Sequence, residues 1–256
     1  MAAKRRAILT KINDAITLID DAGESTCYLV EGETGAMLID SLNGMENLRE
    51  IVSEITDKPV TLVNTHGHCD HIGGNLFFDK AYMSADDFEL FREHSQFPEF
   101  KEIMKKESLS FCPLEPLCVG QTFDMGGLPL EIVSLKVHTK GSIGILDRKH
   151  RILFSGDGAN THIWLQLVES EPIDALIESL RELLNAHGNE FDYILAGHGK
   201  GLEGKDVVTD LVSAAEDFLS GNREGDAPYD TFIQNARIHR YGKNGERAII
   251  YNGDEY

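Results

Sequence analysis

The chain has 256 residues, of which 41% are hydrophobic and 26% are charged, a composition typical of a globular protein with a sizeable core. Its 43 acidic and 24 basic residues give a formal net charge of -19 at pH 7. Because that charge would repel nucleic-acid phosphates and an anionic membrane surface, neither nucleic acid nor a membrane is an expected partner.

No linker, internal repeat or low-complexity tract divides the chain, so we expect a single domain over residues 1–256. The N-terminal segment MAAKRRAILTKINDA begins with a basic cluster but has no continuous apolar run, and no stretch approaches membrane-spanning length. A cytoplasmic location is therefore expected. The four cysteines lack C-x-x-C spacing, which is typical of free thiols in a reducing compartment: Cys27, Cys69, Cys112 and Cys118.

The first part of the chain predicts an antiparallel meander, a helix and a buried strand. Short aliphatic and β-branched runs, separated by turn residues, predict the strands AITLIDD (15–21), STCYLVEG (25–32) and GAMLIDS (35–41). Apolar residues at three- and four-residue steps then predict an amphipathic helix over 45–55. Pro59 ends that helix, and the apolar run VTLVN (60–64) predicts a buried strand.

Strand-like runs return after a charged, helical region at 85–107. They are LPLEIVSLKV (128–137), SIGILD (142–147), RILFSGD (151–157) and DYILAG (192–197). A helix with an apolar face from Ile173 to Leu184 has Ser170 as its candidate cap, and another helix is expected over about 206–220. A C-terminal hairpin over about 233–252 turns at Asn-Gly. This order predicts sheet packed between helical layers.

Three histidines and an aspartate stand close together in THGHCDHIGG (65–74), directly after the predicted buried strand. In extended chain His66 and His68 point to the same side and could share one ion. Asp70 and His71 follow as the chain turns, and the glycines after them allow close approach of the backbone. This pattern favours two adjacent metal positions, with imidazole and carboxylate ligands that suit zinc or iron.

Three later loops each place one candidate ligand after a strand-like run: His138, Asp157 and His198. A lone histidine in such a loop is more often a surface or core residue than a ligand. Four loops that end strands with histidine and aspartate, however, predict one rim of metal ligands. The remaining candidate histidines lack such companions and are expected at the surface: His94, His150, His187 and His239.

These residues resemble the metallo-β-lactamase superfamily. The segment THGHCDHIGG is similar to its H-x-H-x-D-H signature, and the three later candidates follow in the family's order. The resemblance runs from about residue 15 to about residue 220. It implies an α/β fold, the αββα four-layer sandwich with two mixed sheets flanked by helices, and a site at one edge of the sheets.

The resemblance also implies two divalent metal ions, zinc in the first place with iron or manganese as alternatives. By analogy with the family, His66, His68 and His138 hold the first ion, Asp70, His71 and His198 hold the second, and Asp157 bridges both. Asp40 matches the family's early aspartate and would orient a ligand histidine or its loop; a turn or cap residue is the alternative. Cys69, inside the motif, is expected not to be a ligand.

The implied activity is hydrolysis, in which a metal-bridged hydroxide attacks the ester, thioester or lactone carbonyl of a small-molecule substrate and Asp70 helps to carry the proton. Asp157 stands where the best-known zinc β-lactamases have cysteine, which favours the glyoxalase II-like and lactonase-like branches. The C-terminal hairpin replaces the helical region of glyoxalase II and argues against glutathione thioesters. The alternatives are a mono-iron sulfur dioxygenase-like oxidoreductase of the same superfamily and a non-catalytic metal-binding module. A homodimer is a further expectation.

Several other residues have two readings. His162 and Trp164 either line the substrate pocket or pack against other side chains. Four phenylalanines between 88 and 100 form either an apolar wall or lid over the site or, as burial preferences favour, part of the core. Lys140 either meets an anionic substrate or is solvated, the second being favoured.

Overall fold

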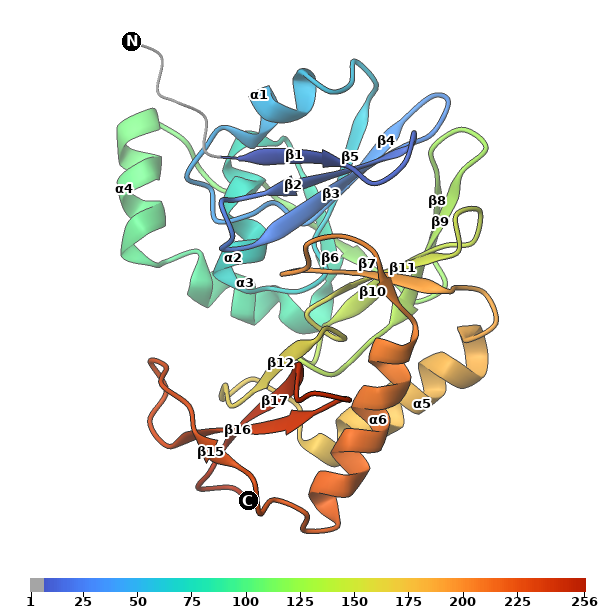
Figure 1. Ribbon diagram of the computed structural model, residues 1–256. Helices are drawn as coiled ribbons and strands as arrows, with labels where there is room; N and C mark the ends of the chain where they lie inside the picture. The colour runs from blue at the N-terminus through green and yellow to red at the C-terminus, as the bar shows by residue number, and fades with distance from the viewer. Residues whose placement is uncertain (1–6) are drawn as a thin grey trace.

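The computed structural model describes residues 7–256 (Figure 1). The basic N-terminal cluster at 1–6 lies outside the described residues. Within the described part, the first sheet has seven strands in chain order: β1 (Ile8–Lys11), β2 (Ile16–Asp20), β3 (Thr26–Glu31), β4 (Ala36–Ile39), β5 (Val60–Val63), β6 (Ala81–Ser84) and β7 (Leu114–Leu117). Strands β1 to β4 are antiparallel, and β4 to β7 are parallel. Strands β2 to β4 confirm the predicted meander, whereas β1 was not predicted.

The second sheet has six strands within residues 7–256, in the order β14-β13-β11-β10-β9-β8. Their bounds are β8 (Thr122–Asp124), β9 (Pro129–Ser134), β10 (Ile143–Asp147), β11 (Ile152–Gly156), β13 (Tyr193–Ala196) and β14 (Glu203–Gly204). Strands β11 and β13 pair in parallel, and the other neighbours are antiparallel. The four strands predicted from the hydrophobic runs of this region are all present.

The helices of the described chain are α1 (Leu48–Ser53), α2 (Cys69–Ile72), α3 (Phe88–His94), α4 (Pro98–Glu107), α5 (Ile173–His187) and α6 (Asp206–Leu219). Two short 3-10 helices cover Gly73–Phe77 and Ala85–Asp87. The first helix is shorter than the predicted 45–55, because the Asn47 side chain accepts from Glu50 N–H and starts it late. Ser170 does not cap α5, which begins directly after Pro172.

Three hydrophobic clusters establish the four layers. Side chains such as Met37 and Phe154 fill the space between the two large sheets. Leu48 and Ile51 of α1 cover the outer face of the first sheet, and α5 and α6 cover that of the second (Figure 1). Complete burial of one large aliphatic or aromatic side chain contributes about 1.5–3 kcal/mol. The expected αββα sandwich is therefore confirmed.

A third sheet was not expected. It has four strands in the described residues, in the order β12-β17-β16-β15: β12 (His162–Leu165), β17 (Arg247–Asn252), β16 (Ala236–Tyr241) and β15 (Ala227–Pro228). Strands β16 and β17 are the predicted C-terminal hairpin. Strand β12 adds to it in parallel and joins the hairpin to the loop after Asp157.

The expectation that isolated histidines lie at the surface is wrong for His239. This ring is buried on β16, where its Nδ1 lies 2.8 Å from Asp226 Oδ1. His150 and His187 are half-buried and each pairs with a nearby carboxylate. No helix in residues 7–256 combines the length and the apolar character needed to cross a membrane.

Candidate metal centre

All seven side chains that the sequence marks as metal ligands lie together at one edge of the sandwich. They are His66, His68, Asp70, His71, His138, Asp157 and His198. The segment after β5, including α2, carries four of them, and the loops after β9, β11 and β13 carry one each. Strands β9, β11 and β13 run in the same direction, so their carboxyl ends meet at this edge.

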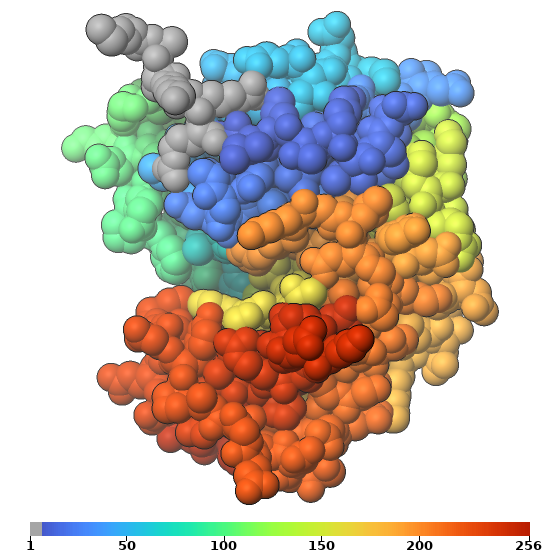
Figure 2. Space-filling view, in the orientation of Figure 1, coloured from blue at the N-terminus to red at the C-terminus, as the bar shows by residue number. Residues whose placement is uncertain are grey.

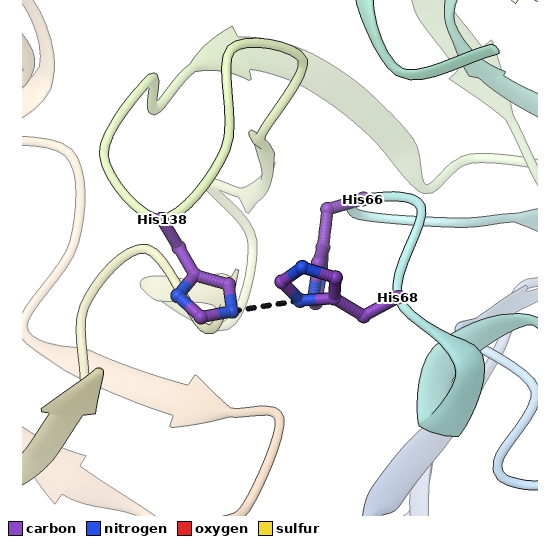
Figure 3. A group of neighbouring side chains, drawn as sticks. All are labelled: His66, His68 and His138. Atoms are coloured by element: carbon purple, nitrogen blue, oxygen red, sulfur yellow. Dashed lines mark hydrogen bonds between the residues drawn. The ribbon is translucent and has the colours of Figure 1, made fainter. Parts of the chain in front are cut away.

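Three histidines form a first cluster (Figure 3). The Nδ1 atom of His68 lies 3.0 Å from Nε2 of His66 and 2.9 Å from Nε2 of His138. Tetrahedral zinc, with Zn–N distances of about 2.0–2.1 Å, places its nitrogen ligands about 3.3 Å apart, so these atoms fit one ion. Burial lowers the pKa of His138 to about 4 and that of His66 well below its usual range. Both rings are therefore neutral, as metal ligation requires.

A second cluster joins a carboxylate to two histidines. The Oδ2 atom of Asp70 lies 3.4 Å from Nε2 of His71 and 3.3 Å from Nε2 of His198. Burial opposes protonation of His71, yet the charges of Asp70 and Asp157 raise its pKa well above the usual range. The charge of Asp157 also raises the pKa of His198 to about 10. This cluster attracts positive charge, which a divalent cation would supply in place of the protons.

Asp157 lies between the two clusters. Its Oδ2 is 3.1 Å from Nε2 of His198 and 3.7 Å from Nε2 of His138, and its Oδ1 is 3.7 Å from Nε2 of His71. The His71 Nε2 and Asp157 Oδ1 atoms are buried without a hydrogen-bond partner. Buried polar atoms are normally paired, so these two fit a cation. A Cβ on Gly197 would lie 2.4 Å from Asp157 Oδ1, which explains glycine beside His198.

Asp40 contacts one of the candidate ligands and the residue just before the motif. It accepts hydrogen bonds from the backbone N–H and the hydroxyl of Thr65, at 2.7 and 2.8 Å, and its Oδ2 lies 3.0 Å from Nδ1 of His71. It therefore contacts both a candidate ligand and the loop before the motif. Its backbone has φ 64°, a left-handed conformation that costs energy for a residue other than glycine. Such strain is typical of functional sites.

Two carboxylates that the sequence analysis missed also contact the centre. Asp87 accepts from the N–H groups of Gly67 and Gly141, at 2.9 and 2.8 Å, and so ties the first-cluster loops together. Glu169 Oε1 lies 2.8 Å from Nε2 of His68. Asp87 stands at the start of a charged helical region and Glu169 in a loop, so no spacing in the sequence marked either of them.

The clusters form the floor of a cavity of about 790 Å³. Its walls are largely apolar and include Phe97, Trp164, Leu167, Val168, Tyr229, Phe232 and Ile233. Figure 2 shows the hollow between the upper part of the molecule and the red C-terminal segment, with yellow residues inside it. Strand β12 of the third sheet, the loop after it and the loop between β15 and β16 thus supply much of the wall.

The lining of the cavity decides between the two alternatives given above for most of these residues. His162 and Trp164 both line it, and both also contact Tyr229, with ring centroids 5.6 and 6.2 Å away. Phe97 lines the cavity, whereas Phe91 and Phe100 are buried and Phe88 packs partly buried beside Phe91. Lys140 is exposed and is not among the lining residues.

Cys69 and His94 also lie at this cavity. The Cys69 thiol lines the cavity but belongs to neither donor cluster. The expectation that His94 lies at the surface is wrong, because its half-buried ring stacks on that of His68 with centroids 5.1 Å apart.

The chain is similar to several known proteins. The chain is 28% identical over 162 residues to the acyl-coenzyme A thioesterase MBLAC2 of Gallus gallus, covering 54% of the chain and 58% of that protein. The chain therefore spans less than two thirds of that relative's length. It is 25% identical over 185 residues to the hydroxyacylglutathione hydrolase GloC of Haemophilus influenzae, covering 70% of the chain and 87% of the relative.

A solved metallo-β-lactamase from Erythrobacter litoralis superposes with a TM-score of 0.59 at 19% identity, over 84% of this chain and 98% of that one, and so shares the fold. Residues 20–198 match the family model described as the Metallo-beta-lactamase superfamily. That match covers well over half of the chain and includes all seven candidate ligands. The chain belongs to the metallo-β-lactamase superfamily.

Proposed function

We propose that the protein is a binuclear metal-dependent hydrolase that cleaves an ester, a thioester or a lactone. The observation that carries the proposal is the pair of donor clusters that meet at Asp157 on the floor of an apolar-walled cavity. Two relatives are named for thioester or hydroxyacylglutathione hydrolysis, which supports the same class of reaction.

The seven donors would hold two ions. His66, His68 and His138 would bind the first, Asp70, His71 and His198 the second, and Asp157 both. Zinc suits these imidazole and carboxylate ligands best, with iron or manganese as alternatives. Bound there, the ions would lower the pKa of a water and polarise the substrate carbonyl.

The side chains of the protein would supply proton transfer and orientation. Asp70 lines the cavity beside His71 and His198, so it is placed to pass a proton from water to the leaving oxygen or sulfur. Hydrolysis adds water across the acyl bond and releases an acid with an alcohol or thiol. Aspartate at 157, in place of the cysteine of zinc β-lactamases, argues against β-lactam substrates.

The cavity sets the kind of substrate. Its volume of about 790 Å³ is within the range of small-molecule sites, and its outer wall is formed by aromatic and aliphatic side chains such as Trp164 and Phe232. We therefore propose a small molecule with an apolar group next to the scissile carbonyl. A cytoplasmic location and a homodimer stay predictions from the sequence.

The decisive experiment is elemental analysis of the purified protein together with a panel of esters, thioesters and lactones. About two zinc ions per chain with turnover support the proposal, as expected for a binuclear site. A single iron with oxygen consumption would overturn it in favour of the sulfur dioxygenase alternative. A chain that binds no metal would overturn both.

The bridging role of Asp157 is tested with Asp157→Ala. It should lose one or both metals and the activity together, because its carboxylate faces both clusters. Asp57→Ala, at an exposed position between α1 and β5, is the matched control and should keep both. Full metal content with normal turnover in Asp157→Ala would contradict the assignment.

A further inference from the structure

We propose that Glu169 is a positioning residue that holds His68 with its Nδ1 atom toward the first cluster, and that the affinity of this cluster for metal depends on it. The inference rests on the proposed function, since it assumes that a metal ion binds there. It adds a carboxylate from the loop after β12 to the residues that build the centre.

The geometry of His68 fixes the role of its partner. Its Nδ1 faces the other two histidines of the first cluster, whereas its Nε2 lies 2.8 Å from Glu169 Oε1. An imidazole that binds metal through one nitrogen carries its proton on the other. His68 Nε2–H therefore donates to Glu169. This contact selects the tautomer and fixes the plane of the ring.

The other two histidines of the cluster have uncharged partners at their outer nitrogens. His138 Nδ1 lies 2.8 Å from the carbonyl oxygen of Trp164, and His66 Nδ1 lies 3.0 Å from the Thr65 hydroxyl. A carboxylate partner increases the basicity of the ligand and restrains its orientation more than a neutral acceptor does. Glu169 contacts the outer nitrogen of a histidine in the first cluster, just as Asp40 contacts the outer nitrogen of His71 in the second.

His94 completes the arrangement. Cys69 N–H donates to His94 Nδ1 at 3.1 Å, so the ring carries its proton on Nε2, which lies 4.0 Å from Glu169 Oε1. The ring also stacks on His68. His68 is thus fixed at its edge by a hydrogen bond and at its face by packing.

An alternative is that His68, His94 and Glu169 form a third metal site, because their donor atoms lie close together. A third ion would have to bind His68 through Nε2 while Nδ1 binds the first ion. The ring would then have to lose both of its protons, and Nε2 could no longer donate to Glu169. The hydrogen-bonded arrangement is therefore favoured, and metal counting distinguishes the two.

The position of Glu169 links the substrate wall to the metal. Leu167 and Val168, just before it, line the cavity, and Trp164 both lines the cavity and contacts His138. Strand β12 and the loop after it therefore contact two of the three histidines of the first cluster. The third sheet contributes to metal binding as well as to the shape of the pocket.

The test compares Glu169→Ala and Glu169→Gln with Glu171→Ala, a control that removes a carboxylate from the same loop. Zinc affinity is measured by competition with a chromophoric chelator, and the thermal midpoint of the metal-free protein reports folding. Glu169→Ala should lower the affinity for one of two zinc ions by about 10–100-fold and leave the affinity for the other unchanged. Glu169→Gln should bind more tightly than Glu169→Ala, because its amide oxygen still accepts from Nε2–H.

Three outcomes would overturn the inference. Zinc affinities in Glu169→Ala equal to those of the wild type would show that the contact does not position His68. A third equivalent of zinc that Glu169→Ala loses would show a metal site instead. An equal loss in Glu171→Ala would show a general effect of charge. Metal content and turnover of the wild type test the proposed function separately, so the two failures are distinguishable.

Discussion

Asp40→Asn is the substitution that best tests how the centre is supported. Asparagine keeps the size of the side chain and tolerates the left-handed backbone at φ 64°. Its amide oxygen can still accept from Thr65 N–H, but its NH₂ group would face the Thr65 hydroxyl and His71 Nδ1 in place of Oδ2. A hydrogen bond to a charged group contributes about 1.5–3 kcal/mol, so the loss of two gives about 3–6 kcal/mol.

The lower end of that range is expected. The Thr65 oxygen can instead accept from the new NH₂ group, which leaves a loss of about 3 kcal/mol in the free energy of unfolding. An amide donor beside His71 Nδ1 also disfavours a proton on that atom, so a neutral ring would keep its proton on Nε2, the atom that faces the second cluster. The affinity for one metal should therefore fall by about 10–100-fold.

Urea denaturation of the metal-free protein measures the first effect, and chelator competition measures the second. Asp57→Asn, the same change at an exposed position between α1 and β5, should leave both unchanged. An unaltered denaturation midpoint and two unaltered zinc affinities in Asp40→Asn would refute the reasoning, because the three contacts would then contribute nothing.

Two further predictions concern protonation in the metal-free protein. Since the charge of Asp157 raises the pKa of His198 to about 10, this ring is protonated at neutral pH and must lose its proton when zinc binds; the release should diminish as the pH rises through that value. Calorimetry in buffers of different ionisation enthalpy measures it, and heats independent of the buffer would contradict it. Burial raises the pKa of the Cys69 thiol to about 11, so iodoacetamide should label the exposed Cys118 before Cys69. Peptide mass spectrometry measures the order of labelling, and labelling of Cys69 first would contradict the prediction.

Much of the sandwich could be predicted because the pattern of its strands is local. The runs at 15–21, 25–32 and 35–41 alternate or are fully apolar, and turn residues separate them. The third sheet could not be predicted in this way, since HIWL at 162–165 is short and its partner strand lies far along the chain. Its existence depends on a tertiary pairing that no local periodicity reports.

The candidate ligands could be predicted because few residue types bind divalent metals and each followed a strand-like run. Their supporting residues divide into two kinds. Asp40 was marked by its own place after a strand, but Asp87 and Glu169 lie among 43 acidic residues with nothing to distinguish them. Which loop contacts which is decided by packing, so a carboxylate that orients a ligand from another loop is visible only in the folded chain.

The parallel pairing of β12 with β17 affects the order in which the centre is completed. Strand β12 gains its partner when residues 247–252 have been synthesised, long after the motif at 66–71. The entropic cost of closing a loop grows with its length, and it must be met before a contact between distant residues stabilises the chain. We therefore expect the carbonyl of Trp164 that contacts His138 to be fixed late in folding. A metal ion present during synthesis would meet the early histidines first, and the finished pocket would close around it.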